Sequence, residues 1–222
     1  RNKKDLDRVR AATAKAWKNT PYHVTHDLEI ALGPREGTSV LVLSGTGSCC
    51  FGRATDGRTA KMGGWGHILG DKGSGFEIGL RGLKAVVFYF DRDGTWSRLG
   101  ERLLMATTCN EPNDLIDWVA QADKAAIAAL AVEVFAAGKQ RDRIARDVLK
   151  GAVSTLAKDA IDCAKKLAGE DEPIEFVLAG GVLRNQPTFA KAVRTEIRRH
   201  WSKAKITKLK RDGVWGAIAL AQ

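Results

Sequence analysis

Apolar runs alternate with glycine-rich and charged segments along the chain, and their spacing separates strands from helices. Residues 39–43 are apolar at nearly every position, which is typical of a strand buried inside a sheet. Short runs at 49–53 and 58–62, joined by the hairpin signal Asp56-Gly57, extend this strand into a three-stranded meander. Further strands are expected at 22–25, 175–178 and 204–209.

Helical periodicity accounts for most of the remaining chain. Residues 5–17 and 141–168 each carry apolar positions along one face. Helices are also expected at 28–32, 76–90, 97–107, 113–120, 124–137, 187–201 and 214–221. A meander, then helices, then alternating strand and helix predict an α/β protein with a mixed sheet and flanking helices.

Composition narrows the class of protein. The 222 residues are 44% hydrophobic and 28% charged, which is ordinary globular usage. We expect no membrane span, because the apolar stretches fall short of about 18 residues, and we see no export signal. The four cysteines form no CxxC pair and the four histidines have no ligand spacing. We therefore expect reduced thiols, a cytoplasmic location and no metal held by protein ligands alone.

Positive charge is concentrated near the end of the chain. The net charge is +10, and residues 191–211 contain nine Lys or Arg and one acid, Glu196. Such a segment can attract a polyanion such as a nucleotide. Because Phe189, Val193, Ile197 and Trp201 recur every four residues, the basic residues are also explained as the solvated face of a helix. Without an aromatic RNA-binding motif or zinc-finger spacing, nucleic acid is not expected.

Three glycine-rich segments and one aspartate are candidates for chemistry. Gly45, Thr46, Gly47 and Ser48 form a turn after the buried strand, where backbone N–H groups can converge on a phosphate, although a plain hairpin turn has the same composition. Gly180, Gly181 and Val182 follow another strand and fit either a nucleotide or a tight strand-to-helix turn. Asp27 is either a functional carboxylate or the N-cap of the helix at 28–32.

The segment from Gly63 to Gly75 is the most unusual of the three. Six of its 13 residues are glycine, which is costly in backbone entropy and permits a ligand to approach the main chain. Trp65 offers an apolar face, and His67 and Asp71 offer polar contacts, a combination suited to a sugar or another polyol. The alternatives are that Trp65 belongs to the core and that Asp71 caps the next helix.

The order of these elements resembles the BadF/BadG/BcrA/BcrD-type ATPases, and within them the N-acetylglucosamine kinases. The resemblance rests on residues 43–48, on residues 63–74, on Ala179 to Val182 and on Asp27, and it extends over residues 22–221. It implies an actin-like ATPase (ribonuclease H-like) fold that closes on ATP, Mg²⁺ and an amino sugar. We expect residues 1–36 to be the remnant of an N-terminal actin-like domain and residues 37–222 to be the C-terminal one.

The resemblance also assigns roles to individual residues. Asp27 would be the general base. ATP would be bound by Gly45, Thr46, Gly47, Ser48, Gly180, Gly181 and Val182, and the sugar by Gly64, Trp65, Gly66, His67 and Asp71. We expect a homodimer. The sequence departs from the family at Lys72, where an acid is usual, and it lacks the family's first phosphate motif, so residues 1–222 alone are expected to be inactive.

Two other functions fit the same family. One is the ATPase activator of a 2-hydroxyacyl-CoA dehydratase or benzoyl-CoA reductase, which carries an iron–sulfur cluster between subunits and needs suitably placed cysteines. The other is a non-catalytic sugar- or nucleotide-binding domain, such as those attached to N-acetylmuramic acid 6-phosphate etherases. The sequence does not select among N-acetylglucosamine, glucosamine, N-acetylmuramate and glucose.

Overall fold

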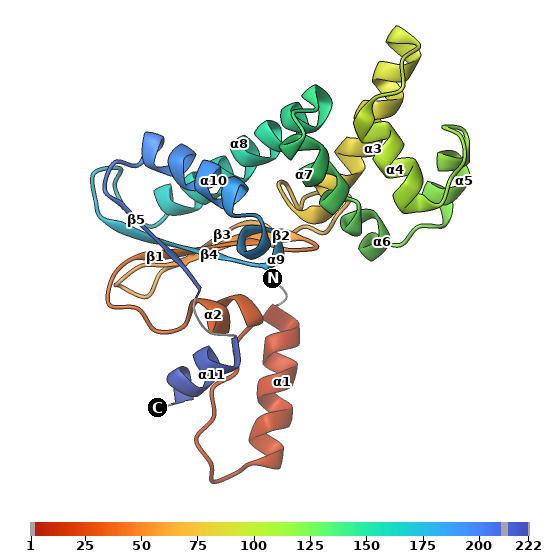
Figure 1. Ribbon diagram of the computed structural model, residues 1–222. Coiled ribbons are helices and arrows are strands. Elements are labelled where there is room, and N and C mark those ends of the chain that lie inside the picture. Colours follow the sequence, from red (N-terminus) through yellow and green to blue (C-terminus); the bar gives the residue numbers. More distant parts are fainter. Residues whose placement is uncertain (1–2, 210–212, 222) are drawn as a thin grey trace.

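A five-stranded mixed sheet lies at the centre of the computed structural model, which describes residues 3–209 and 213–221 (Figure 1). The strands are β1 (Ser39–Ser44), β2 (Ser48–Arg53), β3 (Thr59–Gly63), β4 (Ile174–Ala179) and β5 (Ala204–Lys208), in the spatial order β3-β2-β1-β4-β5. The first three pair antiparallel, and β4 and β5 continue the sheet in parallel with β1. The predicted meander and its buried central strand are therefore confirmed.

Helices cover both faces of this sheet. They are α1 (Lys3–Ala16), α2 (Asp27–Leu32), α3 (Gly75–Asp93), α4 (Arg98–Thr107), α5 (Asp114–Gln121), α6 (Lys124–Ala129), α7 (Ala131–Lys139), α8 (Arg143–Lys165), α9 (Gly181–Asn185), α10 (Pro187–His200) and α11 (Gly213–Ala221). Figure 1 shows α8 and α10 over one face, and α1, α2 and α11 on the other side of the sheet. None of the helices in the described ranges is long and apolar enough to cross a membrane.

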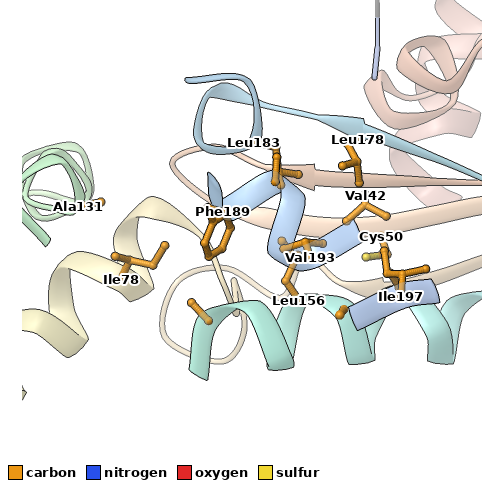
Figure 2. Close-up of a cluster of buried hydrophobic side chains, with 14 of the residues drawn as sticks. Val42, Cys50, Ile78, Ala131, Leu156, Leu178, Leu183, Phe189, Val193 and Ile197 are labelled. Carbon is orange, nitrogen blue, oxygen red and sulfur yellow. The ribbon is translucent and has the colours of Figure 1, made fainter. Parts of the chain in front are cut away.

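Two apolar cores lie on opposite faces of the sheet. In the larger core, α10 contributes Phe189, Val193 and Ile197, which Figure 2 shows close to Leu156 of α8. The stripe predicted on α10 is therefore confirmed, and Arg198 and Arg199 of the same helix are exposed to solvent. The smaller core packs α2 against the other face of the strands.

Two local predictions were wrong, and one short helix was missed. Residues 22–25 form no strand, because no described strand pairs with them to satisfy their backbone groups. The helix expected at 124–137 is broken between α6 and α7, where the N–H of Leu130 bonds to the carbonyl of Ile127 at 3.2 Å. The five-residue helix α9 is too short to leave a periodic signal in the sequence.

The last helix packs against an early one. A Cβ atom added to Gly216 of α11 would lie 1.8 Å from the carbonyl oxygen of Ile30 in α2, so the two backbones touch. The end of the chain thus returns to the segment assigned to the first domain. The domain boundary at residues 36 and 37 stays a prediction.

Candidate functional site

The three glycine-rich segments meet at the carboxyl ends of β1 and β4. A Cβ atom on Gly180 would lie 2.2 Å from the carbonyl oxygen of Ser44, and one on Gly45 would lie 3.8 Å from the backbone nitrogen of Gly181. The backbone N–H of Gly75 donates to the carbonyl of Gly45 at 2.8 Å. This edge is where ligands bind in sheets of this kind.

The turn at residues 45–48 is held in shape by its own backbone and by α3. The N–H of Gly45 donates to the carbonyl of Gly47 at 2.9 Å, and the N–H of Phe76 donates to the carbonyl of Thr46 at 3.2 Å. The side chain of Ser48 is buried, and its hydroxyl donates to the carbonyl of Lys72 at 2.7 Å. Thr46 is therefore left as the exposed hydroxyl of the turn.

Asp71 joins the long glycine-rich segment to this turn. It is 4% exposed, with a left-handed backbone φ of 58°. One carboxylate oxygen accepts from the N–H of Ser48 at 3.1 Å, and the other accepts from Nζ of Lys124 at 2.8 Å. A Cβ atom on Gly47 would lie 2.8 Å from the same carboxylate, so only glycine fits beneath it.

The alternative role of Asp71 as a helix cap was wrong. The N-cap of α3 is Ser74, whose hydroxyl accepts from the N–H of Glu77 at 3.1 Å. Lys124, by contrast, was missed in the sequence. It lies 53 residues from Asp71 and begins α6, so no local pattern connects the two residues.

Trp65 is not a core residue, because its side chain is 64% exposed. It lines a hollow of about 440 Å³ together with His26, Phe51 and Lys61. His67, two residues further along, is also exposed and packs its ring edge-on against Phe76 with 4.8 Å between ring centroids. The structure therefore places Trp65 where a ligand can reach it, between the flanking residues Gly64 and Gly66.

Asp27 is the first residue of α2 and is not its N-cap. The N-cap is His26, whose Nδ1 accepts from the N–H of Glu29 at 3.1 Å. Burial lowers the pKa of His26, which favours the neutral ring that this bond requires. Asp27 is exposed, and one of its oxygens accepts from the N–H of Leu28 at 2.9 Å. Asp27 directly follows His26, which lines the hollow with Trp65, but Asp27 is not itself one of the residues that line it.

A second buried carboxylate lies under the long glycine-rich segment and was also missed. Asp159 of α8 is 9% exposed, and a Cβ atom on Gly63 would lie 3.6 Å from it. Burial raises the pKa of Asp159, and the nearby charge of Lys72 opposes that rise. Lys72, the position at which the sequence departs from the family it resembles, therefore reduces the electrostatic cost of the buried Asp159 carboxylate.

We expect Asp159→Asn to raise the free energy of unfolding at pH 7 by roughly 1 kcal/mol. The pKa of Asp159 in the folded state is raised above its ordinary 3.8. Ionisation of Asp159 therefore lowers the free energy of unfolding as the pH rises from 3.8 through the folded-state pKa. Below pH 3.8 the two proteins should be equally stable. Urea unfolding at pH 7 and pH 3 measures this. Asp162→Asn is the control, because Asp162 is paired with Lys158 and its loss should not stabilise; a gain confined to pH 3 would contradict the account.

The fold is that of the actin-like sugar kinases. The crystal structure of a Chromobacterium violaceum protein, described as a candidate N-acetylglucosamine kinase, matches with a TM-score of 0.70 at 24% identity, over 96% of this chain and 72% of the other. The sequence identifies the family more closely. The chain belongs to the BadF/BadG/BcrA/BcrD ATPase family, whose model matches residues 13–221.

Two relatives of known name are similar over 90% of the chain. The N-acetylmuramic acid/N-acetylglucosamine kinase of Clostridium acetobutylicum is 34% identical, and the N-acetyl-D-glucosamine kinase of Dictyostelium discoideum is 29% identical. The chain spans 66% and 65% of the lengths of these two proteins. The predicted family and fold are thus confirmed.

Proposed function

We propose that the protein transfers the γ-phosphoryl group of ATP to a hydroxyl group of an amino sugar. One observation carries this proposal. The turn at 45–48, the glycine-rich segment 63–75 and the turn at 180–182 meet at one edge of the sheet. Membership in an ATPase family and the names of the two relatives support it.

The geometry of the turns is suited to a nucleotide. Thr46 and the backbone of Gly45 and Gly47 would hold the phosphates, since a glycine turn presents N–H groups without side chains in the way. A Cβ atom on Gly181 would meet nothing within 4 Å, which leaves open space for the nucleoside beside Gly181 and Val182. Mg²⁺ would be held by the phosphate oxygens, because the described residues contain no group of three or more metal-ligating side chains.

The sugar would lie in the hollow lined by Trp65 and His26, the residue that precedes Asp27. Gly64, Gly66 and His67 would border the sugar. Asp71 would hold the segment 63–75 against the turn at 45–48. Asp27 would take the proton of the sugar hydroxyl. At the same time the sugar oxygen would form a bond to the γ-phosphorus of ATP, and the bond from that phosphorus to the leaving oxygen of ADP would break. In phosphoryl transfer the protein mainly positions the reactants and offsets charge, which these elements can do.

A screen for sugar-dependent ADP release tests the proposal. The complete protein is incubated with ATP, Mg²⁺ and each of N-acetylglucosamine, glucosamine, N-acetylmuramate and glucose. We expect at least one amino sugar to raise ADP release about tenfold or more above the rate without sugar. Equal rates with and without every sugar would contradict an amino-sugar kinase.

We expect Trp65→Ala to weaken amino-sugar binding by about tenfold and to change ATP affinity less than twofold. A tenfold loss of affinity is about 1.4 kcal/mol, which is a reasonable value for one lost contact with an aromatic face, and Trp65 lies outside both nucleotide turns. Calorimetry with each ligand measures the two affinities. Trp17→Ala is the matched control, because Trp17 is 60% exposed and does not line the hollow. Loss of ATP affinity with unchanged sugar affinity would contradict the sugar assignment.

The buried cysteines favour the kinase over the iron–sulfur activator. A cluster shared between subunits needs thiolates at an exposed surface. Cys49, Cys50 and Cys163 are buried, and burial raises the pKa of Cys163 to about 12.

The homodimer and the cytoplasmic location stay predictions.

A further inference from the structure

We infer that a cavity between α7, α8 and α10 binds an organic phosphate that carries an apolar ring. The cavity has a volume of about 640 Å³, which is within the range of small-molecule sites. None of its lining residues belongs to the turns at 45–48 and 180–182 or to the segment 63–75. The site is therefore additional to the one proposed for ATP and sugar.

The rim of the cavity is strongly basic. Five cations line it, at Lys139, Arg141, Arg143, Arg146 and Lys150, against one carboxylate, Asp147. All five are exposed, and none forms an ion pair within 4.0 Å with a described residue. Like charges held together repel one another, and a multiply charged anion relieves that repulsion.

The local structure explains why these charges gather. Arg143, Arg146 and Lys150 recur at helical spacing along α8, so they share one face. Arg141 lies in the turn between α7 and α8 with a left-handed φ of 66°. Asp142, in the same turn, accepts from the N–H groups of Leu99 and Ala145 at 3.1 and 2.9 Å, so both of its carboxylate oxygens have backbone partners.

The lining of the cavity also has an apolar part. Half-buried Leu149 and Val153 of α8 and Ala192 of α10 line it. Beneath them Phe135 of α7 and Phe189 of α10 are buried and contact edge-on, with 5.4 Å between ring centroids. A simple inorganic anion would leave the half-buried apolar lining in contact with water, whereas a flat ring would cover it. The combination of rim and apolar lining therefore selects a ligand with a ring and a phosphate group.

Titration with 1-naphthyl phosphate tests this inference, because the compound joins a flat apolar ring to a dianionic phosphate. We expect it to bind the complete protein at least tenfold more tightly than either inorganic phosphate or 1-naphthol. Arg143→Glu combined with Arg146→Glu should weaken its binding at least tenfold. The control, Arg198→Glu combined with Lys203→Glu, makes the same charge change on exposed residues outside the cavity and should alter binding less than twofold. Circular dichroism melting verifies that both variants fold.

Three results would overturn the inference. Equal weakening in both charge variants would show attraction by the overall charge of +10. Affinity for inorganic phosphate equal to that for naphthyl phosphate would exclude a ring site. Loss of naphthyl phosphate binding in Thr46→Val, with unchanged binding in the variant that combines Arg143→Glu and Arg146→Glu, would place the probe at the turn at 45–48.

Discussion

Asp27→Asn is expected to lower the turnover number of the complete protein about 100-fold or more, with the fold unchanged. A positioned general base contributes about 10²–10⁴-fold to the rate. The asparagine oxygen can still accept from the N–H of Leu28, and the N-cap of α2 is His26, so the substitution removes the base and retains the helix. Steady-state kinetics with a saturating amino sugar measure the effect.

Glu29→Gln is the matched control for this substitution, because it neutralises a carboxylate in the same helix. Glu29 is paired with Arg53 at 3.3 Å and bonds to Thr25, so its loss should affect stability more than turnover. Near-normal turnover in Asp27→Asn would show that Asp27 is only the first residue of a helix.

Gly180→Ala and Gly181→Ala are expected to separate folding from nucleotide binding. Gly180 has a φ of 94°, and its Cβ would lie 2.2 Å from the backbone oxygen of Ser44, so alanine there should cost about 3 kcal/mol or more of unfolding free energy. Gly181 has nothing within 4 Å of its Cβ position, so alanine there should change stability by less than about 0.5 kcal/mol. If a nucleoside occupies that space, Gly181→Ala should weaken ATP binding about tenfold.

Urea unfolding and ATP calorimetry on both variants measure these two effects. Each glycine is the control for its neighbour, because the change in composition is identical. An ATP affinity that Gly181→Ala leaves unchanged would remove the nucleoside from the turn at 180–182. A stable Gly180→Ala protein would show that β1 and β4 can separate at this edge.

Short-range patterns predicted most of the sheet and its principal helices. The apolar run at 39–43 is stable only where both of its faces are buried, at the centre of a sheet, and the four-residue repeat from Phe189 to Trp201 defines one buried helix face. Both patterns can be recognised from residues that are close in the sequence. The break between α6 and α7 depends instead on how the chain crosses α3, where a Cβ on Gly79 would lie 2.1 Å from the carbonyl oxygen of Ile127.

The candidate site was predicted as separate motifs, and its connections were not. The glycine segments are visible because their composition is unusual. The pairing of Asp71 with Lys124 and the burial of Asp159 beneath Gly63 join distant parts of the chain, so only the folded structure reveals them. Likewise, the sequence does not distinguish Gly180, which is enclosed by backbone, from Gly181, which faces open space.

Phosphorus NMR of the complete protein with ATP, Mg²⁺ and N-acetylglucosamine tests the central claim most directly, because it identifies what receives the γ-phosphoryl group. The account predicts a sugar phosphomonoester signal that grows in equal amount with ADP and depends on the sugar. ADP accompanied by inorganic phosphate alone, in the presence of each amino sugar in turn, would contradict the account and would indicate an ATPase.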